Sequence, residues 1–396
     1  MTPRHVVVVG AGLGGLRTVE SLRREGFDGR ITLVGDEEEP PYDRPPLSKE
    51  VLTGARAPET VYLRPPERLA ALDIDLIVGR QVGALSLDER TIELGASELE
   101  FDALVIATGA SPRTLDELDG RGGVHTLRTL ADSIRLGAAL REAGRVTVVG
   151  AGFIGSEVAA SARSLGCQVT IVELEQTPLA RALGPEMGAV LMDLHREHGT
   201  ELRLGVRVVE AEGDPVTRLR LSDDTTLDTD IVVVGIGVVP NIAWLDGSGL
   251  ELANGVVCDA SLEAGAEGVY AVGDVASWPN ELFGRRMRVE HWTNTSDQAR
   301  HAARNLLHGT QEPFLGSNYV WSDQYGYRIQ FVGSTLGAKA QVVAGCADAR
   351  EFVAWYREAD RLVGAIGIGL PRLLMKSRTL IEERRRWNDA LAELEV

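Results

Sequence analysis

A glycine fingerprint that occurs twice, each time between two β-like runs, restricts the fold of this chain more than any other feature. In the first copy, residues 6–9 form a valine run that is followed by Gly10-Ala11-Gly12-Leu13-Gly14-Gly15. A helical pattern to about residue 25 then leads to a second apolar run over residues 31–34, with Asp36 just beyond it. This order predicts a βαβ unit.

The second copy repeats the order further along the chain. Residues 146–149 precede Gly150-Ala151-Gly152-Phe153-Ile154-Gly155, a helix reaches about residue 165, and a strand over residues 169–172 leads directly to Glu173. In such a fingerprint the first glycine makes a tight turn, the second lets a pyrophosphate approach the backbone, and the third lets helix and strand pack closely. The phosphates lie at a helix N-terminus, and the terminal acid accepts hydrogen bonds from ribose hydroxyls. A single copy is weak evidence, but two complete copies predict two bound dinucleotides.

Strand-like runs on both sides of the second copy predict that one domain is inserted in another. Residues 104–109 and 269–274 each read as a buried strand that ends in a glycine turn. Beyond residue 312 the pattern changes to short strand-like runs and two helices, which predicts a third, α+β domain. The runs cover residues 328–332, 341–344, 352–356 and 362–368, and the helices are expected near residues 370–377 and 381–394.

Composition limits the classes of protein that need to be considered. The 396 residues are 44% apolar and 25% charged, and the longest apolar stretches fall short of the roughly 20 residues that a membrane span needs. With no secretory signal after Met1, we expect a cytoplasmic protein that does not bind membranes. Cys167, Cys258 and Cys346 form no C-x-x-C pair or metal cluster, and a net charge of −17 argues against nucleic-acid binding.

Further motifs accompany the two fingerprints. They are Pro41-Tyr42-Asp43-Arg44-Pro45-Pro46-Leu47-Ser48-Lys49, Ala107-Thr108-Gly109, Leu127-Arg128-Thr129, Gly235-Ile236-Gly237, Val272-Gly273-Asp274 and Trp321-Ser322-Asp323-Gln324. Through them nearly the whole chain resembles the two-dinucleotide flavoprotein reductases, and most closely the NADH-dependent ferredoxin reductases of bacterial cytochrome P450 and Rieske dioxygenase systems. The resemblance implies a glutathione-reductase-like α/β fold with FAD and NADH as cofactors. The expected domains are an FAD domain over residues 1–112 and 242–311, an NADH domain over 113–241 and an interface domain over 312–396.

The resemblance also implies which residues hold FAD. They are Gly10, Gly12, Leu13, Gly14, Gly15, Asp36, Arg44, Lys49, Val82, Ala107, Thr108, Gly109, Arg128, Gly273, Asp274, His291 and Trp292. Lys49 and Arg128 can offset the charge of the pyrophosphate and of the reduced flavin, and Asp274 can accept a hydrogen bond from the ribityl chain. Taken alone, Lys49 and Arg128 are better explained as solvated surface charges. Some members of the family carry a smaller residue at the position of Trp292.

Along NADH the resemblance places residues of the second fingerprint and a few others. They are Gly150, Gly152, Phe153, Ile154, Gly155, Glu157, Glu173, Gly237, Glu290 and Trp321, with Glu157 and Trp321 expected at the reacting centre. Glu157 lies in the first turn after the glycine loop, although it could be an ordinary surface acid, and a tryptophan such as Trp321 more often packs in a core. The run Glu173-Leu174-Glu175-Gln176 repels the 2′-phosphate of NADPH and favours NADH.

The reaction follows from how many electrons each carrier takes. A hydride carries two electrons and an iron–sulfur cluster accepts one, and a flavin can store the pair and release it in steps. No cysteine occurs between Asp43 and Lys49, where disulfide reductases of the superfamily keep a redox pair, so the electrons are expected to leave directly from the flavin. The resemblance implies that the partner is a small [2Fe-2S] ferredoxin that feeds a cytochrome P450 or a Rieske oxygenase, and the expected state is a monomer or weak homodimer.

An acidic ferredoxin needs a basic patch on this acidic protein. Arg285, Arg286 and Arg288 precede the segment Glu290-His291-Trp292, and Arg300 follows on the next expected helix, where the family places a docking cation. The patch could be completed by Arg372, Lys376 and Arg378. Any one of these basic residues, taken alone, is equally well explained as a solvated surface charge. Two alternative functions stay open: reduction of rubredoxin or a small organic acceptor, and redox sensing by a flavoprotein without rapid turnover.

Overall fold

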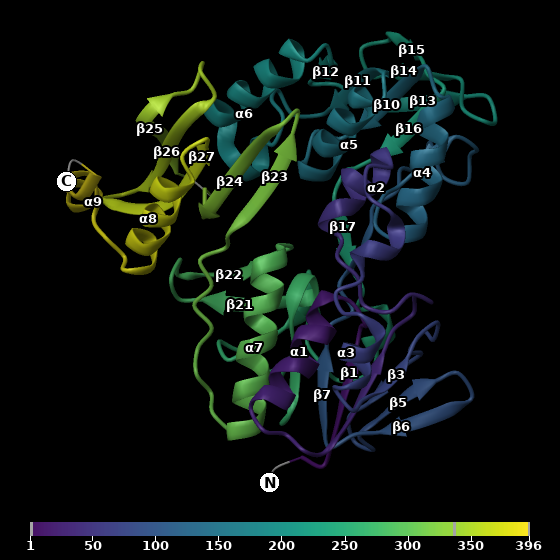
Figure 1. Ribbon diagram of the computed structural model, residues 1–396, viewed down its shortest axis with the longest axis vertical. Coiled ribbons are helices and arrows are strands. Elements are labelled where there is room, and N and C mark those ends of the chain that lie inside the picture. The colour runs from purple at the N-terminus through teal and green to yellow at the C-terminus, as the bar shows by residue number, and fades with distance from the viewer. Residues whose placement is uncertain (1–2, 336–337, 395–396) are drawn as a thin grey trace. The chain divides into compact units, whose positions relative to one another are not determined.

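The computed structural model describes residues 3–335 and 338–394. The chain forms two compact units, and each contains one of the two glycine fingerprints (Figure 1). Unit 1 consists of Met1–Asp43, Tyr62–Ser111 and Val239–Tyr319, and unit 2 consists of Arg44–Val61, Pro112–Val238 and Val320–Val396. The mixed α/β fold confirms the predicted fold class, whereas the boundaries of three separate domains stay a prediction.

Unit 1 is built on a parallel sheet in the order β20-β7-β1-β2-β3. Its strands are β1 (His5–Val9), β2 (Arg30–Val34), β3 (Asp75–Ile77), β7 (Ala103–Ile106) and β20 (Val269–Ala271). The valine run of β1 is fully buried, because a parallel sheet buries both of its faces. Helix α1 (Leu13–Arg24) packs against α7 (Trp292–His308), as Figure 1 shows.

Smaller elements complete unit 1. They are α3 (Pro66–Ala70), the antiparallel strands β4 (Leu85–Ser86), β5 (Thr91–Leu94) and β6 (Ser97–Glu100), the mixed sheet of β18 (Leu252–Ala253), β19 (Gly255–Val257), β21 (Ala276–Asn280) and β22 (Arg285–Arg288), and the 3₁₀ turns η3 (Ala243–Leu245) and η4 (Gly273–Val275). The chain passes between the units at β8 (Ala110–Pro112) and β17 (Val238–Pro240). No described helix combines the length and the apolar composition of a bilayer span.

Unit 2 repeats the parallel architecture in the order β12-β11-β10-β16-β9. Its sheet and the elements around it are β9 (Val124–His125), β10 (Arg145–Val149), β11 (Gln168–Glu173), β12 (Glu201–Leu204), β16 (Ile231–Val234), α4 (Leu130–Glu142), α5 (Phe153–Ser164), α6 (Ala180–Glu197), and the antiparallel strands β13 (Val208–Glu212), β14 (Arg218–Leu221) and β15 (Thr226–Asp228). The 3₁₀ turns η1 (Pro45–Ser48) and η2 (Pro58–Val61) and the short α2 (Glu50–Thr53) belong to the same unit. Both predicted βαβ units are therefore confirmed.

The C-terminal part of unit 2 is an antiparallel sheet in the order β23-β24-β27-β26-β25, with two helices. Its elements are β23 (Val320–Gln324), β24 (Tyr327–Gly333), β25 (Lys339–Cys346), β26 (Glu351–Glu358), β27 (Arg361–Ile368), α8 (Pro371–Glu382) and α9 (Trp387–Leu394). The four predicted strands are confirmed. The predicted start of the last helix at residue 381 is wrong, because Ile381 is a buried residue of α8 and the left-handed φ of +56° at Arg384 separates the two helices.

Candidate functional site

The first glycine loop leaves room for a ligand at one position only. A Cβ atom at Gly10, where φ is +115°, would lie 2.1 Å from the Ala107 carbonyl oxygen, and one at Gly15 would lie 2.0 Å from the Gly10 oxygen. At Gly12 the same atom would meet nothing within 4 Å. Gly12 is also the N-cap of α1, which has no side-chain cap and no acid in its first turn. The open approach and the uncapped N–H groups fit a pyrophosphate.

The second loop has the same geometry. A Cβ atom at Gly150, where φ is +102°, would lie 2.4 Å from the Gly235 oxygen, and one at Gly155 would lie 2.1 Å from the Gly150 oxygen. At Gly152 the nearest atom would be 3.8 Å away, and α5 again begins without a side-chain cap or a first-turn acid. Each unit therefore carries one loop that is shaped for a dinucleotide phosphate.

The acids that follow the two loops differ in their contacts. Glu173 is held at its loop, because Oε2 accepts a hydrogen bond from the Ala151 N–H at 2.7 Å and Oε1 accepts one from the Glu175 N–H at 2.9 Å. The strand registers pair Val149 with Val172 and Val9 with Val34, so the position equivalent to Glu173 in unit 1 is Gly35. Asp36 lies one residue further on and is exposed. Sequence spacing alone had treated the two acids as equivalent.

Other predicted FAD residues gather in unit 1 at the start of α7. The Gly273 N–H donates to Gln298 Oε1 at 2.7 Å, and a Cβ atom at Gly14 or Gly273 would press on Thr295 at 3.2 or 3.0 Å. Within the described residues Gln298 Nε2, Ser296 Oγ and His291 Nδ1 are buried without a hydrogen-bond partner, which fits a polar ligand at this place. The sequence did not single out Thr295, Ser296 or Gln298.

Trp292 and His291 begin α7 with defined surroundings. The Trp292 indole N–H donates to Asp43 Oδ1 at 2.7 Å, and the Arg17 guanidinium lies 5.8 Å from the indole centroid. Desolvation lowers the pKa of His291 to about 4, so its imidazole is neutral near pH 7. Of the remaining predicted residues of unit 1, Val82 is buried and Leu13, Ala107, Thr108, Gly109 and Asp274 are half-buried.

In unit 2, Glu157 collects four hydrogen-bond donors from two other segments. Oε2 accepts from Lys49 Nζ at 2.7 Å and from Ser48 Oγ at 2.5 Å. Oε1 accepts from Ser322 Oγ at 2.8 Å and from the Asp323 N–H at 3.2 Å. We call Ser48, Lys49, Glu157, Ser322 and Asp323 the Glu157 cluster.

The burial of the Glu157 cluster bears on two interpretations that the sequence left open, namely that Glu157 is an ordinary surface acid and that Lys49 is a solvated surface charge. The Glu157 side chain is 5% exposed and that of Lys49 14% exposed, so neither residue is an ordinary surface charge. The Ser161 hydroxyl donates to the Ser48 carbonyl at 2.6 Å, which fixes the segment before Lys49 on α5. Trp321 precedes Ser322 on β23 and is half-buried. The structure thus brings Lys49, Glu157 and the strand of Trp321 together.

The other predicted residues of unit 2 lie around this centre or on its loop. Arg44 Nη1 donates to the Arg128 carbonyl at 2.6 Å, and the Arg128 N–H donates to Asp132 Oδ2 at 3.1 Å. Ile154 is 47% exposed at the start of α5 beside the half-buried Phe153, and Gly237 is exposed with φ of +100°.

The four predicted docking arginines have different surroundings in unit 1. Arg286 Nη1 donates to the carbonyls of Cys258 and Ser277 at 2.9 and 2.6 Å. Arg288, whose side chain is 10% exposed, donates to the Asp274 carbonyl at 2.8 Å and pairs with Glu290 at 2.7 Å. Arg285 is half-buried on β22. Arg300 differs, because it is exposed and pairs only with Asp297 among the described residues.

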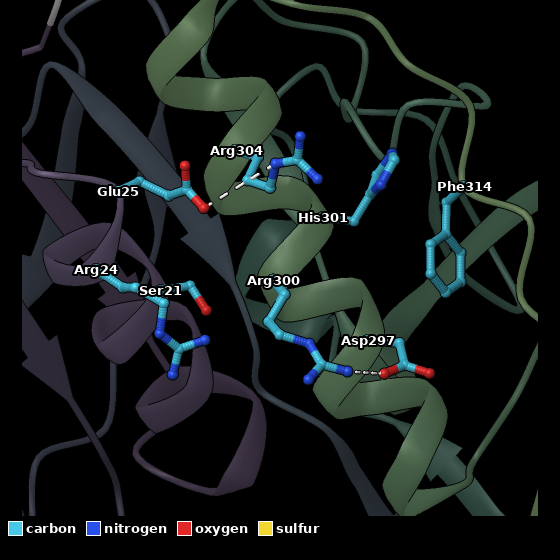
Figure 2. Close-up of a pocket in the computed structure, with 8 residues that line it drawn as sticks. All are labelled: Ser21, Arg24, Glu25, Asp297, Arg300, His301, Arg304 and Phe314. Carbon is cyan, nitrogen blue, oxygen red and sulfur yellow. Dashed lines mark hydrogen bonds and ion pairs between the residues drawn. The ribbon is translucent and has the colours of Figure 1, made fainter.

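A surface pocket of about 240 Å³ opens beside Arg300, between α1 and α7. Figure 2 shows its lining residues, which are Ser21, Arg24, Glu25, Asp297, Arg300, His301, Arg304 and Phe314. Arg304 lies 4.0 Å from Glu25, whereas Arg24 has no ion pair within the described part of the chain. Sequence reasoning missed both residues. Arg304 lies four residues from Arg300 on α7, a helical spacing that the sequence itself shows, whereas Arg24 comes beside Arg300 through the packing of α1 on α7.

Comparisons with known proteins match almost the whole chain. Residues 4–299 match the pyridine nucleotide-disulphide oxidoreductase family, and residues 319–394 match the reductase C-terminal family. Rhodocoxin reductase of Rhodococcus erythropolis is 38% identical over 95% of this chain and 89% of its own length. The ferredoxin–NAD(+) reductase component of the p-cumate 2,3-dioxygenase system of Pseudomonas putida is 37% identical over 96% and 93%. Putidaredoxin reductase in its covalent complex with putidaredoxin superposes with a TM-score of 0.94 at 33% identity, covering 99% of this chain and 98% of that one.

Proposed function

Because this chain belongs to the pyridine nucleotide-disulphide oxidoreductase family, we propose that it is an FAD-dependent oxidoreductase that passes electrons from NADH to a small [2Fe-2S] ferredoxin. The ferredoxin in turn feeds a cytochrome P450 or a Rieske oxygenase. One observation carries the proposal: two uncapped glycine loops occur in one chain whose segment before Lys49 has no cysteine. The similar rhodocoxin reductase and the similar reductase component of the p-cumate 2,3-dioxygenase system support it, and we assign the enzyme to the cytoplasm.

Bound FAD supplies the chemistry that accepts a hydride from NADH and releases the electrons singly. The residues of the chain bind and orient the two cofactors. The loop at Gly12 and the loop at Gly152 each offer uncapped N–H groups to a pyrophosphate. Glu157 holds the Lys49 ammonium in place, so that a fixed cation is available to the reduced, anionic flavin. We retain Arg44, Asp36, Arg128, Asp274, Glu290 and Trp321 as cofactor contacts under the same proposal.

The decisive experiment compares electron acceptors. The purified protein, reconstituted with FAD, should reduce a [2Fe-2S] ferredoxin with NADH at rates well above those with rubredoxin or small quinones. Ferricyanide, which accepts from an exposed flavin, serves as the control acceptor. Rapid ferricyanide reduction without ferredoxin reduction would favour a different acceptor, and slow NADH oxidation with every acceptor would favour a redox sensor.

The cysteines lead to a prediction about redox capacity. Burial raises the pKa of Cys167 and raises that of Cys258 to about 12, so both thiols stay protonated and unreactive near pH 7. Cys346 is exposed on β25. We therefore expect dithionite titration to consume one two-electron equivalent per FAD, and alkylation of Cys346 to leave acceptor reduction intact. Uptake of four electrons would reveal a second redox group.

Glu173 is expected to set the preference for NADH. Replacement by arginine removes the carboxylate that we propose as the acceptor for the ribose hydroxyls of NADH, and it replaces the repulsion of the 2′-phosphate of NADPH with an attraction at the end of β11. The preference for NADH over NADPH should fall by about 1 to 3 kcal/mol, the worth of a charge-assisted hydrogen bond. Steady-state kcat/KM with both nucleotides measures this change, and Glu142→Arg, at an exposed position at the end of α4 in the same unit, is the control. If the wild-type enzyme uses NADPH equally well, the assigned role of Glu173 is wrong.

For ferredoxin docking we propose the face around Arg300. The pocket beside it adds Arg24 and Arg304, so three arginines meet where α1 packs on α7. The backbone hydrogen bonds of Arg286 and Arg288 suit a structural role, which makes Arg300 the stronger candidate for direct contact. Docking at Arg285, Arg286 and Arg288 stays a prediction, as does the monomeric or weakly dimeric state.

A further inference from the structure

The hairpin that joins β23 to β24 turns on an unusual residue. Its two central residues, Tyr325 and Gly326, have φ of +51° and +84°. Two positive φ angles are what a two-residue type I′ turn requires, and such turns favour Asn-Gly because a large side chain is strained in the left-handed region. A tyrosine at this position indicates that its side chain is needed, since strained residues persist where the surroundings hold them in place.

The Tyr325 side chain reaches into a buried polar group. Its hydroxyl lies 2.8 Å from His195 Nδ1 and 2.8 Å from Thr200 Oγ1, and its ring stacks on His198 with centroids 4.5 Å apart. Burial raises the pKa of Tyr325 to about 12, and burial together with the nearby His198 lowers the pKa of His195 to about 4. Near pH 7 a neutral phenol therefore meets a neutral imidazole, and each has a hydrogen-bond partner.

From His195 the contacts continue to the helix that carries Glu157. His195, which is fully buried on α6, places Nε2 3.3 Å from Ser156 Oγ. Ser156 and Glu157 are consecutive residues of α5, where Ser156 ends the first turn and Glu157 begins the second. This part of α5 therefore contacts the β23 hairpin twice, directly at Ser322 and Asp323 through Glu157, and at Tyr325 through Ser156 and His195.

We propose that Tyr325 is a positioning residue for the Glu157 cluster. Its hydrogen bonds to His195 and Thr200 anchor the end of β23, and this anchor keeps Ser322 and Asp323 on Glu157 and Trp321 in its place on the same strand. Glu157 in turn holds Lys49. The inference rests on the proposed function, in which the Glu157 cluster serves the transfer from NADH to FAD.

The test replaces Tyr325 with Phe, which keeps the ring and removes only the hydroxyl. We expect anaerobic stopped-flow measurements to show flavin reduction by NADH slowed several-fold at saturating NADH, with little change in the NADH concentration that half-saturates the rate. Reoxidation of the dithionite-reduced enzyme by ferricyanide should stay unchanged. In the protein without cofactors, the Asp323 N–H should exchange with solvent faster, because its contact with Glu157 opens more often.

Matched variants separate positioning from a simple loss of stability. Thr200→Val, which removes the other hydroxyl of this contact, should also slow flavin reduction, whereas Thr200→Ser keeps the hydroxyl and should reduce FAD at the wild-type rate. Tyr327→Phe should leave the rate unchanged, since the described residues give the Tyr327 hydroxyl no hydrogen bond. If Tyr325→Phe does not retain FAD, Thr200→Val carries the same test. Wild-type flavin reduction and wild-type exchange at Asp323 would overturn the proposal. If NADH also reduces the flavin of Glu157→Gln at the wild-type rate, the role proposed for Glu157 is wrong as well.

Discussion

Replacing Glu157 with Gln should slow the reduction of FAD by NADH by about 10²-fold, the size of effect that a small misplacement of a reacting group produces. Glutamine has the same shape and can still accept from Ser322 and from the Asp323 N–H. It cannot neutralise Lys49, whose ammonium lies 2.7 Å from the carboxylate in a largely buried position. Without the carboxylate the ammonium is no longer held in place, and the fixed cation that we propose for the flavin is lost.

Anaerobic stopped-flow absorbance of the flavin measures this rate directly. Glu50→Gln is the matched control, because Glu50 is exposed next to Lys49 and undergoes the same chemical change. We expect the FAD content to stay near that of the wild type, since Glu157→Gln does not alter the glycine loop at Gly12. Equal rates in Glu157→Gln and the wild type would remove Glu157 from the reacting centre.

Reversing the charge at Arg300 should lower the rate of association with ferredoxin by at least tenfold at low salt, within the range that electrostatic steering supplies. Arg300→Glu places a second acid beside Asp297 and converts a basic pocket rim into an acidic one. The loss should shrink as the ionic strength rises, because salt screens exposed charges. The reduction of uncharged acceptors and the rate of flavin reduction by NADH should not change.

Arg68→Glu is a suitable control for this charge reversal. Arg68 is exposed on α3 of the same unit and does not line the pocket. Arg24→Glu and Arg304→Glu extend the test to the arginines that the fold adds. If Arg300→Glu slows reduction of an uncharged quinone and of ferredoxin alike, Arg300 supports the flavin site instead, and if neither changes, it is not part of the docking surface.

The parts of the site that sequence could predict are those that depend on local chain order. The glycine loops follow directly from spacing, because the strand, turn and helix that shape them are neighbours in the chain. The steric contacts of Gly10 and Gly15 match the roles assigned to them. Asp36 shows the limit of this reasoning: a position one residue past a strand end changes which way a side chain points, and spacing near a turn does not specify it.

The residue patterns of the sequence did not predict which side chains from distant segments contact one another. Lys49 and Arg128 looked like surface charges until the fold placed Lys49 against Glu157. Arg300 and Arg304 of the pocket are four residues apart on α7, but nothing in either helix alone predicts that Arg24 of α1 lies beside them. Tyr325 gave no signal either, because a Tyr-Gly turn is informative only when its φ angles and the buried groups beneath it are known.

The packing of α7 on α1 has a consequence for the order in which a newly made chain can fold. In unit 1, strand β7 needs β20 on one edge and α1 needs α7, so β7 waits for residues up to Ala271 and α1 for residues up to His308 to leave the ribosome. The parallel sheet of unit 2 needs nothing beyond Val234. The second nucleotide fold can therefore form first during synthesis, although its fingerprint comes later in the gene, and chains that stop short of β20 and α7 expose an unpaired strand edge and the apolar face of α1, both of which promote aggregation.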